Sequence, residues 1–201
     1  MKKIMTFIAL CIGYSMALPI YAQIGMPSRS IVNPDSVSCD FYRTETVTGN
    51  TITFKVNHSL STLYQITDIR NTMVFAPMPL NDGVTRTEPL DLSLTILPVS
   101  TEPIFQAFLD TFSPDEIRTL ALYKEYLSVN YALTTSGSVM EIGFTIPRDH
   151  PRLYNIPPQY LEKLSAKLKN SVSFSVPRSL NIYKYVTLTQ DVYFSFLVDK
   201  L

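Results

Sequence analysis

The residues of this sequence that are best suited to metal binding or catalysis are its two histidines, His58 and His150. A zinc site takes three or four His, Cys or carboxylate ligands at recognisable spacings. His58 has no such neighbours, and His150 has only the adjacent Asp149, in a loop that Pro151 continues. We therefore interpret both histidines as surface or capping residues, and we predict no metal site and no cofactor.

Nucleophilic and phosphate-binding chemistry also lacks a motif. The chain has many Ser and Asp residues, but none of its Ser residues lies in a G-x-S-x-G elbow. Its 6 glycines form neither a G-x-x-x-x-G-K-[ST] loop nor a G-x-G-x-x-G loop. The adjacent carboxylates of Asp115 and Glu116 fit the first turn of a helix, where the helix dipole favours negative charge. We predict no catalytic residues and expect a protein that is not an enzyme.

The N-terminal segment 1–22 has the pattern of a cleavable export signal. Lys2 and Lys3 form a positive n-region, an apolar run follows, and Pro19 breaks the helix before a cut after Ala22. An uncleaved anchor is the alternative, but the apolar run barely reaches the roughly 20 residues of a membrane span. The cut could also follow Ala17. We predict export to the periplasm or cell surface of a Gram-negative bacterium, with no stable membrane span after cleavage.

Cysteine chemistry depends on that cleavage, which would leave a single thiol, Cys39. Cys11 follows Ile8-Ala9-Leu10, whereas a lipid-modified cysteine usually follows a small residue, so we read it as part of the signal. One thiol cannot form an internal disulfide. Cys39 is then either a buried apolar side chain or a free thiol that can pair between chains. Val37 and Phe41 alternate with it as in a strand, which favours burial.

The composition constrains the class of partner. Removal of Lys2 and Lys3 leaves 15 basic residues against 17 acidic ones, so the processed chain would carry a net charge of about −2. Nucleic-acid binding normally needs a basic face, and we therefore predict no nucleic-acid partner. The 179 residues that would remain are enough for one domain, or for two lobes that share a core.

The segment 23–36 has no periodicity and is predicted to be an extended lead-in, followed by a mainly β segment over 37–100. Residues 41–48 and 51–56 are predicted to form a hairpin, with Gly49-Asn50 in a II′ turn. The range 64–75 is ambiguous between helix and strand. Leu92, Leu94 and Ile96 alternate as a strand that Pro98 closes.

The remainder, 101–201, is predicted to be an α+β unit. Helices are expected over 102–110, from a capping box at Ser113 onward, and over 158–169, where Leu161, Leu164 and Leu168 share one face. Residues 129–134 and 139–146 form a hairpin with one apolar face. Strands are expected over 172–176, 183–189 and 192–196. The predicted fold class is α+β: antiparallel β-hairpins with two or three helices and a C-terminal β-β-α-β unit.

This order of elements resembles the C-terminal domain of TonB-type periplasmic proteins. The residues that carry the resemblance are the turn at Ser136-Gly137-Ser138, the strand Val139–Phe144, the Leu-rich helix after Pro157-Pro158, and the closing run Val192–Phe196. The chain lacks the long Pro-rich spacer of a TonB transducer, so the resemblance does not imply energy transduction. It implies a shared fold and an envelope setting. The whole chain is also similar to small exported Gram-negative proteins of unknown function.

We expect a protein–protein interaction module that binds an envelope protein through a sheet edge, because strand addition needs no distinctive side chains. The residues predicted to offer that edge are Phe174, Tyr193 and Ser195. The alternative is a glycan- or surface-binding protein that uses exposed tyrosines. The exposure of four tyrosines separates the two hypotheses: Tyr131, Tyr183, Tyr185 and Tyr193.

Overall fold

The fold is known from a computed structural model. The structure describes residues 44–58, 62–83, 96–150, 152–153 and 156–201. The predicted signal peptide, the lead-in and Cys39 lie outside the described residues, as does most of the predicted strand that ends at Ile96. The statements below concern the described residues.

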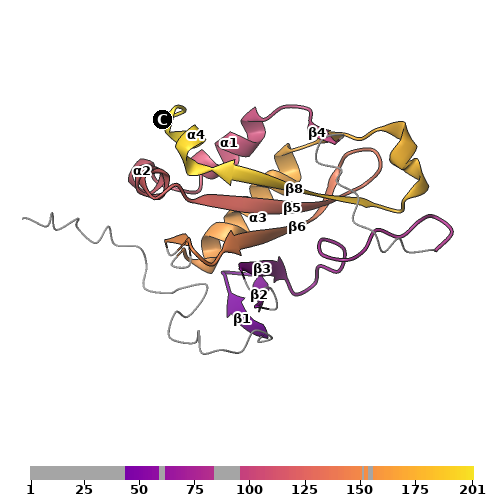
Figure 1. The fold of residues 1–201 in the computed structure, drawn as a ribbon, viewed down its shortest axis with the longest axis horizontal. Helices are drawn as coiled ribbons and strands as arrows, with labels where there is room; N and C mark the ends of the chain where they lie inside the picture. Colours follow the sequence, from indigo (N-terminus) through magenta and orange to yellow (C-terminus); the bar gives the residue numbers. More distant parts are fainter. Residues whose placement is uncertain (1–43, 59–61, 84–95, 151, 154–155) are drawn as a thin grey trace, which may run out of the picture.

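A six-stranded antiparallel sheet organises the molecule, in the order β1-β2-β3-β6-β5-β8 (Figure 1). Its strands are β1 (Thr44–Thr48), β2 (Thr53–Asn57), β3 (Leu63–Asp68), β5 (Tyr126–Leu133), β6 (Val139–Pro147) and β8 (Val186–Tyr193). A second, two-stranded sheet pairs β4 (Leu97–Pro98) with β7 (Phe174–Ser175). Because β3 pairs with β6, the first three strands of the 37–100 segment continue the sheet of the 101–201 unit.

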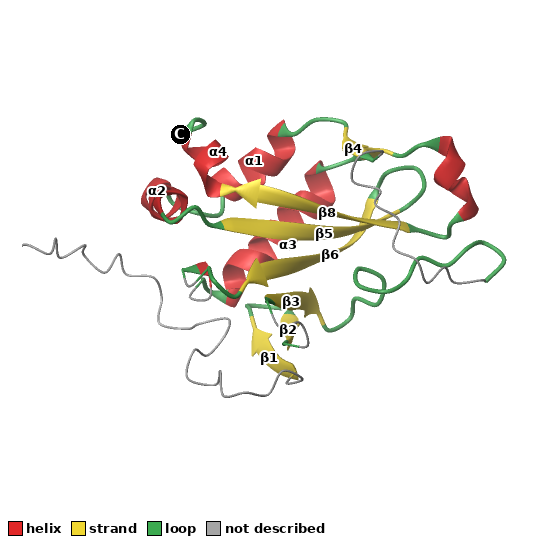
Figure 2. Cartoon of the chain, viewed as in Figure 1, coloured by secondary structure: helices red, strands yellow, loops and turns green. Residues whose placement is uncertain are grey.

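Four α-helices and a short 3₁₀ helix complete the fold, which is therefore α+β as predicted. They are α1 (Glu102–Leu109), α2 (Pro114–Leu122), α3 (Pro158–Ser171), α4 (Phe194–Val198) and η3 (Arg178–Ile182). Figure 2 shows α3 behind β5, β6 and β8, so this helix covers one face of the sheet, and α1 packs against α3. The predicted capping box is present, since Glu116 N–H donates to Ser113 Oγ and Ser113 N–H donates to the Glu116 carboxylate.

The core lies between that sheet face and α3. Val129 and Tyr131 on β5 stand opposite Phe144 and Ile142 on β6, and all four side chains are buried. The predicted helical stripe faces them, with Leu161, Leu164 and Leu168 fully buried. The buried strand residues repeat every two positions, and the buried residues of α3 repeat every three or four. The two sets of side chains therefore meet in one apolar layer.

The other face of the β5–β6 hairpin is polar, in keeping with the prediction of one apolar face, but it is buried as well. Asn130 and Thr145 are also buried, and Asn130 Nδ2 donates to Thr145 Oγ1 at 2.8 Å. Part of the cover comes from the loop that follows β3, since a Cβ at Gly143 would lie 2.6 Å from Val74 Cγ1. The Glu141 carboxylate holds this loop by accepting the N–H groups of three consecutive residues, Thr72, Met73 and Val74.

Strands β1 and β2 form the first hairpin close to the predicted ranges 41–48 and 51–56, but its turn differs from the predicted one. Thr48 pairs with Thr53, so the loop has four residues, and Gly49 does not have the positive φ that a II′ turn requires. The reason is a tertiary contact. The Glu162 carboxylate on α3 accepts the N–H groups of Asn50, at 2.6 Å, and Thr51. A Cβ at Gly49 would overlap Glu162 Oε2, so a side chain at this position would have to displace the carboxylate.

The C-terminus contains one strand and one helix, where two strands were predicted over 183–189 and 192–196. The alternation of Val192, Phe194 and Phe196 indicated a strand, but the chain leaves β8 at Tyr193 and continues as α4. Phe194 and Leu197 are the fully buried residues of this helix, three apart on one face. The Phe194 ring packs edge-on against Phe112, with ring centroids 5.1 Å apart. Helical burial against α2 therefore outweighs the short alternating pattern.

The segment 172–176 is likewise shorter than predicted as a strand. Val172 caps the end of α3, and only Phe174 and Ser175 pair with β4. The ambiguous range 64–75 begins with β3, on which Tyr64 and Ile66 alternate as buried residues.

Candidate functional site

The three residues predicted to offer a binding edge occupy three different elements. Tyr193 ends β8, the outer strand of the six-stranded sheet, and its side chain is 39% exposed. Ser195 lies in α4, so its placement on a strand was wrong. Phe174 lies on β7 of the second, two-stranded sheet, and its ring is buried 4.9 Å from that of Tyr131. Of the three, only Tyr193 is on an edge of the main sheet.

The outer side of β8 can be assigned from two hydrogen bonds. Phe194 N–H donates to the Glu125 carbonyl at 3.2 Å, which points its main chain toward the β5 side. Thr187 N–H donates to Met78 Sδ at 3.3 Å, away from β5. Since successive main-chain groups of a strand alternate in direction, Thr189, Asp191 and Tyr193 share the outward direction of Thr187.

A loop covers the first part of this edge. Asn81 N–H donates to the Ile182 carbonyl at 2.8 Å, and Lys184 N–H donates to the Pro79 carbonyl at 3.0 Å. The cover ends at the Thr187–Met78 contact. Beyond it, the outward main-chain groups of the stretch Thr189–Tyr193 make no hydrogen bond with any other described residue. We call this stretch the open edge.

The open edge lacks the features that usually protect a sheet edge. Native edge strands are often short, or carry Lys, Pro or a bulge, because an exposed ladder can pair with another chain. β8 has eight residues, VTLTQDVY, with no Lys, Arg or Pro and with Asp191 as its single charge. Its pairing with β5 runs without a register shift from Tyr126–Tyr193 to Leu133–Val186. The open edge is therefore regular enough to template a further strand.

A row of aromatic side chains adjoins the far end of the open edge. Ring centroids are 4.7 Å apart between His150 and Tyr126, 4.9 Å between Tyr126 and Tyr193, and 5.6 Å between Tyr193 and Phe196. Phe196 is 59% exposed. We call these four residues the aromatic row, and its outer members provide apolar surface that an added strand could cover.

The electrostatics near the open edge are negative. The Asp191 side chain accepts a hydrogen bond from Ser128 Oγ at 2.6 Å and is otherwise open to solvent. Burial, and then the nearby charge of Asp191, raise the pKa of Tyr126 above its usual value. The exposed carboxylate of Asp149 contributes to the same rise. A ligand at this position would therefore meet an aromatic surface beside carboxylates.

Glu125 directly precedes Tyr126 of the aromatic row, and its buried carboxyl group holds the loop that contains Arg152 and Leu153. Its two oxygens accept the N–H groups of Arg152, at 2.9 Å, and Leu153, at 2.7 Å. Burial raises the pKa of Glu125 to about 7. Such a value suits a general acid or base, but both oxygens are occupied by main-chain donors, so the geometry assigns Glu125 to the positioning of this loop. No sequence motif marked this residue.

His150, one of the two histidines considered above, belongs to the same loop. Its Nδ1 accepts the N–H of Tyr126 at 3.3 Å, and burial lowers its pKa. The loop therefore places the imidazole against the Tyr126 ring as the inner end of the aromatic row. Across the described residues, no three His, Cys, Asp or Glu side chains gather closely enough to hold a metal ion.

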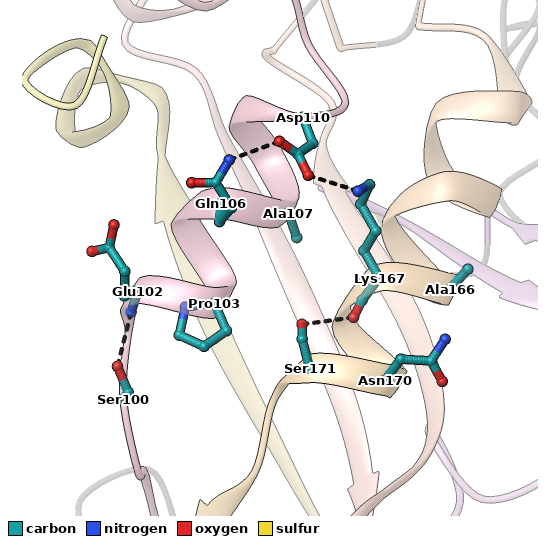
Figure 3. Close-up of a pocket in the computed structure, with 10 residues that line it drawn as sticks. All are labelled: Ser100, Glu102, Pro103, Gln106, Ala107, Asp110, Ala166, Lys167, Asn170 and Ser171. Atoms are coloured by element: carbon teal, nitrogen blue, oxygen red, sulfur yellow. Dashed lines mark hydrogen bonds and ion pairs between the residues drawn. The ribbon is translucent and has the colours of Figure 1, made fainter.

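A hollow of about 690 Å³ lies between α1 and α3 (Figure 3). Pro103, Ala107 and Ala166 line it with small side chains, and Asp110 lies at one end. The Asp110 carboxylate accepts hydrogen bonds from Lys167, at 2.6 Å, and Gln106, at 2.7 Å. The hydrogen bond from Lys167 contributes most to a lowered pKa of Asp110. The carboxylate is thus already paired with a cation and carries no proton at neutral pH.

The four tyrosines that separate the two function hypotheses do not share an open face. Tyr131 and Tyr183 are buried, Tyr185 is half-buried, and Tyr193 is exposed. A free sheet edge combined with buried aromatic residues is the arrangement expected for strand addition. None of the helices in the described part of the chain has both the length and the apolar character that a membrane span requires.

The comparisons with known proteins give a fold and no activity. No family model matches this sequence, and no curated protein matches it significantly. Among solved structures, the chain is similar to the crystal structure of a DUF5043 family protein from Bacteroides uniformis, with a TM-score of 0.58. The two sequences are 18% identical, and the match covers 76% of this chain and 86% of the other. At this identity the likeness shows a shared fold.

Proposed function

We propose that this chain is an exported cell-envelope protein that binds a partner protein by strand addition at the open edge and catalyses no reaction. The observation that supports this most is the stretch Thr189–Tyr193, whose outward main-chain groups have no partner among the described residues. An added strand would form main-chain hydrogen bonds there, and these supply the affinity in this mode of recognition.

The partner is a different protein, because the open edge is poorly suited to pair with itself. When the stretch Thr189–Tyr193 pairs antiparallel with the same stretch of a second copy, Thr189 lies opposite Tyr193 and Asp191 lies opposite Asp191. Like charges directly opposite each other destabilise a strand pair. A register shifted by two residues toward β8's start would need Thr187, whose N–H contacts Met78.

The predicted export signal at 1–22 supports an envelope setting for this partner. The order β5, β6, α3, β8 also follows the β-β-α-β order of TonB-type C-terminal domains, with β7 and η3 inserted before β8. We retain that resemblance as part of the proposal, together with the absence of a nucleic-acid partner.

Replacing Thr189 with proline tests the proposal. Proline removes the outward N–H at the centre of the open edge, and edge strands tolerate proline when that N–H faces solvent. Thr189→Ala is the matched control, since both variants lose the hydrogen bond from Thr189 Oγ1 to Asn130 Oδ1. We expect the alanine variant to retain its partner in envelope fractions of the native host and the proline variant to lose it.

Thermal unfolding of both variants separates loss of binding from loss of fold. Hydrogen exchange of the complex should show slowed exchange at the amides of Thr189, Asp191 and Tyr193. A folded proline variant that still retains the partner would contradict the proposal, as would unchanged exchange at these amides.

A further inference from the structure

The side chains of the open edge carry information about the sequence of the strand that it accepts. In an antiparallel pair, residues directly opposite each other project their side chains to the same face and are in contact. Thr189, Asp191 and Tyr193 project to the face that carries Asn130, Ser128 and Tyr126 on β5, as their pairing shows. An added strand would place three of its own alternate residues beside them.

The residue opposite Asp191 would meet a carboxylate. Asp191 already accepts the hydroxyl of Ser128, and an added strand would remove more of its solvent. A charge that loses solvent without a partner is costly, and an opposite charge offsets that cost. The exposed carboxylate of Asp149 adds to the negative field in this region. Charge complementarity therefore favours Lys or Arg at this position of the partner.

The residue opposite Tyr193 would meet the aromatic row. The Tyr193 ring lies between Tyr126 and Phe196, and both Tyr193 and Phe196 are exposed. Aromatic pairs across strands stabilise a sheet by about 0.2–1 kcal/mol. An aromatic side chain on the partner would extend the aromatic row by one ring and cover its exposed surface.

Every strand pair of the main sheet is antiparallel, and antiparallel pairing is slightly more stable per residue than parallel pairing. An antiparallel partner meets Tyr193 first and Asp191 two residues later. We propose that the open edge selects extended peptides with the pattern aromatic-x-basic, read from the N-terminus. This inference rests on the strand addition proposed above.

Three synthetic peptides test the pattern: Ser-Phe-Thr-Lys-Thr-Ser, the same peptide with Glu for Lys, and the same peptide with Ala for Phe. Each is added at millimolar concentration to the purified protein, and the exchange of the β8 amides is followed by NMR. We expect the first peptide to slow exchange at Thr189, Asp191 and Tyr193 about tenfold near saturation. The other two peptides should each bind about fivefold more weakly.

Substitution of Asp191 provides the matched control on the protein. Asp191→Asn removes the charge but keeps an oxygen for Ser128, so it should abolish the preference for Lys over Glu. Asp191→Lys should reverse that preference.

The outcomes separate this inference from the proposal on which it rests. If the three peptides slow exchange at the open edge equally, strand addition stands and the aromatic-x-basic pattern is wrong. If no peptide slows exchange there, strand addition itself is contradicted. Binding of the Lys peptide that Asp191→Asn leaves unchanged would overturn the assigned role of Asp191.

Discussion

Thr187 donates its main-chain N–H to the sulfur of Met78 at 3.3 Å, and this contact divides the outer edge of β8 into a covered and an open part. Before it, the loop that contains Pro79 and Asn81 pairs with the residues leading into β8. After it, the open edge runs from Thr189 to Tyr193. The division leaves an extended site of five residues, which is long enough for alternating main-chain hydrogen bonds.

The first prediction concerns the core stripe of α3. Leu164 is fully buried at the centre of that stripe, so Leu164→Ala should lower the free energy of unfolding by about 2–5 kcal/mol. Denaturant unfolding measures the change. Asn170→Ala, at an exposed position of the same helix, should change it by less than about 0.5 kcal/mol. A loss at Leu164 as small as that of the control would show that the stripe is not packed.

A second prediction uses the buried hydroxyl of Tyr131. Its oxygen has no hydrogen-bond partner among the described residues, and burial raises its pKa far above the usual value. An unsatisfied buried hydroxyl costs on the order of 1–3 kcal/mol. Tyr131→Phe removes the hydroxyl but keeps the ring against Phe174, and it should raise the melting temperature. Tyr131→Leu loses the ring contact and should lower it. A phenylalanine variant less stable than the native protein would contradict this reading.

Stability should also depend on the charge of Glu125. Its pKa rises from 4.5 to about 7 on folding, so the folded state binds the proton more tightly than the unfolded state. The resulting stability is fully present below pH 4.5 and is lost as the pH rises through about 7. After allowance for solvent screening, the loss is on the order of 2 kcal/mol.

Glu125→Gln removes this titration. Unfolding free energies measured between pH 5 and pH 8 should therefore decline less steeply for the variant than for the native protein. Glu102→Gln, an exposed carboxyl on α1, is the control and should leave the slope unchanged. Equal slopes for Glu125→Gln and the native protein would place the titration elsewhere.

The predicted export signal gives the last prediction. N-terminal sequencing of the protein from an envelope fraction should begin at Gln23, because Ala22 precedes the predicted cut. A sequence that begins at Leu18 would identify the alternative cut after Ala17. Recovery of Lys2 and Lys3 in a membrane fraction would show an uncleaved anchor and contradict the prediction.

Local patterns were sufficient for several elements. The capping box at Ser113 and Glu116 marked the start of α2, because its donors and acceptors lie within one turn. The spacing of Leu161, Leu164 and Leu168 marked α3, and the alternation around Gly137 marked the β5–β6 hairpin. Each of these signals depends on residues close in the sequence, and each therefore needs no knowledge of the rest of the fold.

The candidate site depended on contacts that the sequence does not display. Tyr193 could be selected as an edge residue from its strand pattern, but the end of β8 was decided by the burial of Phe194 and Leu197 against distant helices. The same holds for the loop at Gly49, which Glu162 shapes from α3.

The sequence by itself determined the α+β class and the local elements, because these follow from periodicity, capping and turn residues. Only the tertiary structure decided that β8 is the outer strand, that the loop at Met78 covers its start, and that Tyr126 and Phe196 flank Tyr193. The physical reason is that strand order and edge exposure depend on pairings between residues far apart in the chain. Those pairings are set by the packing of the whole sheet against its helices.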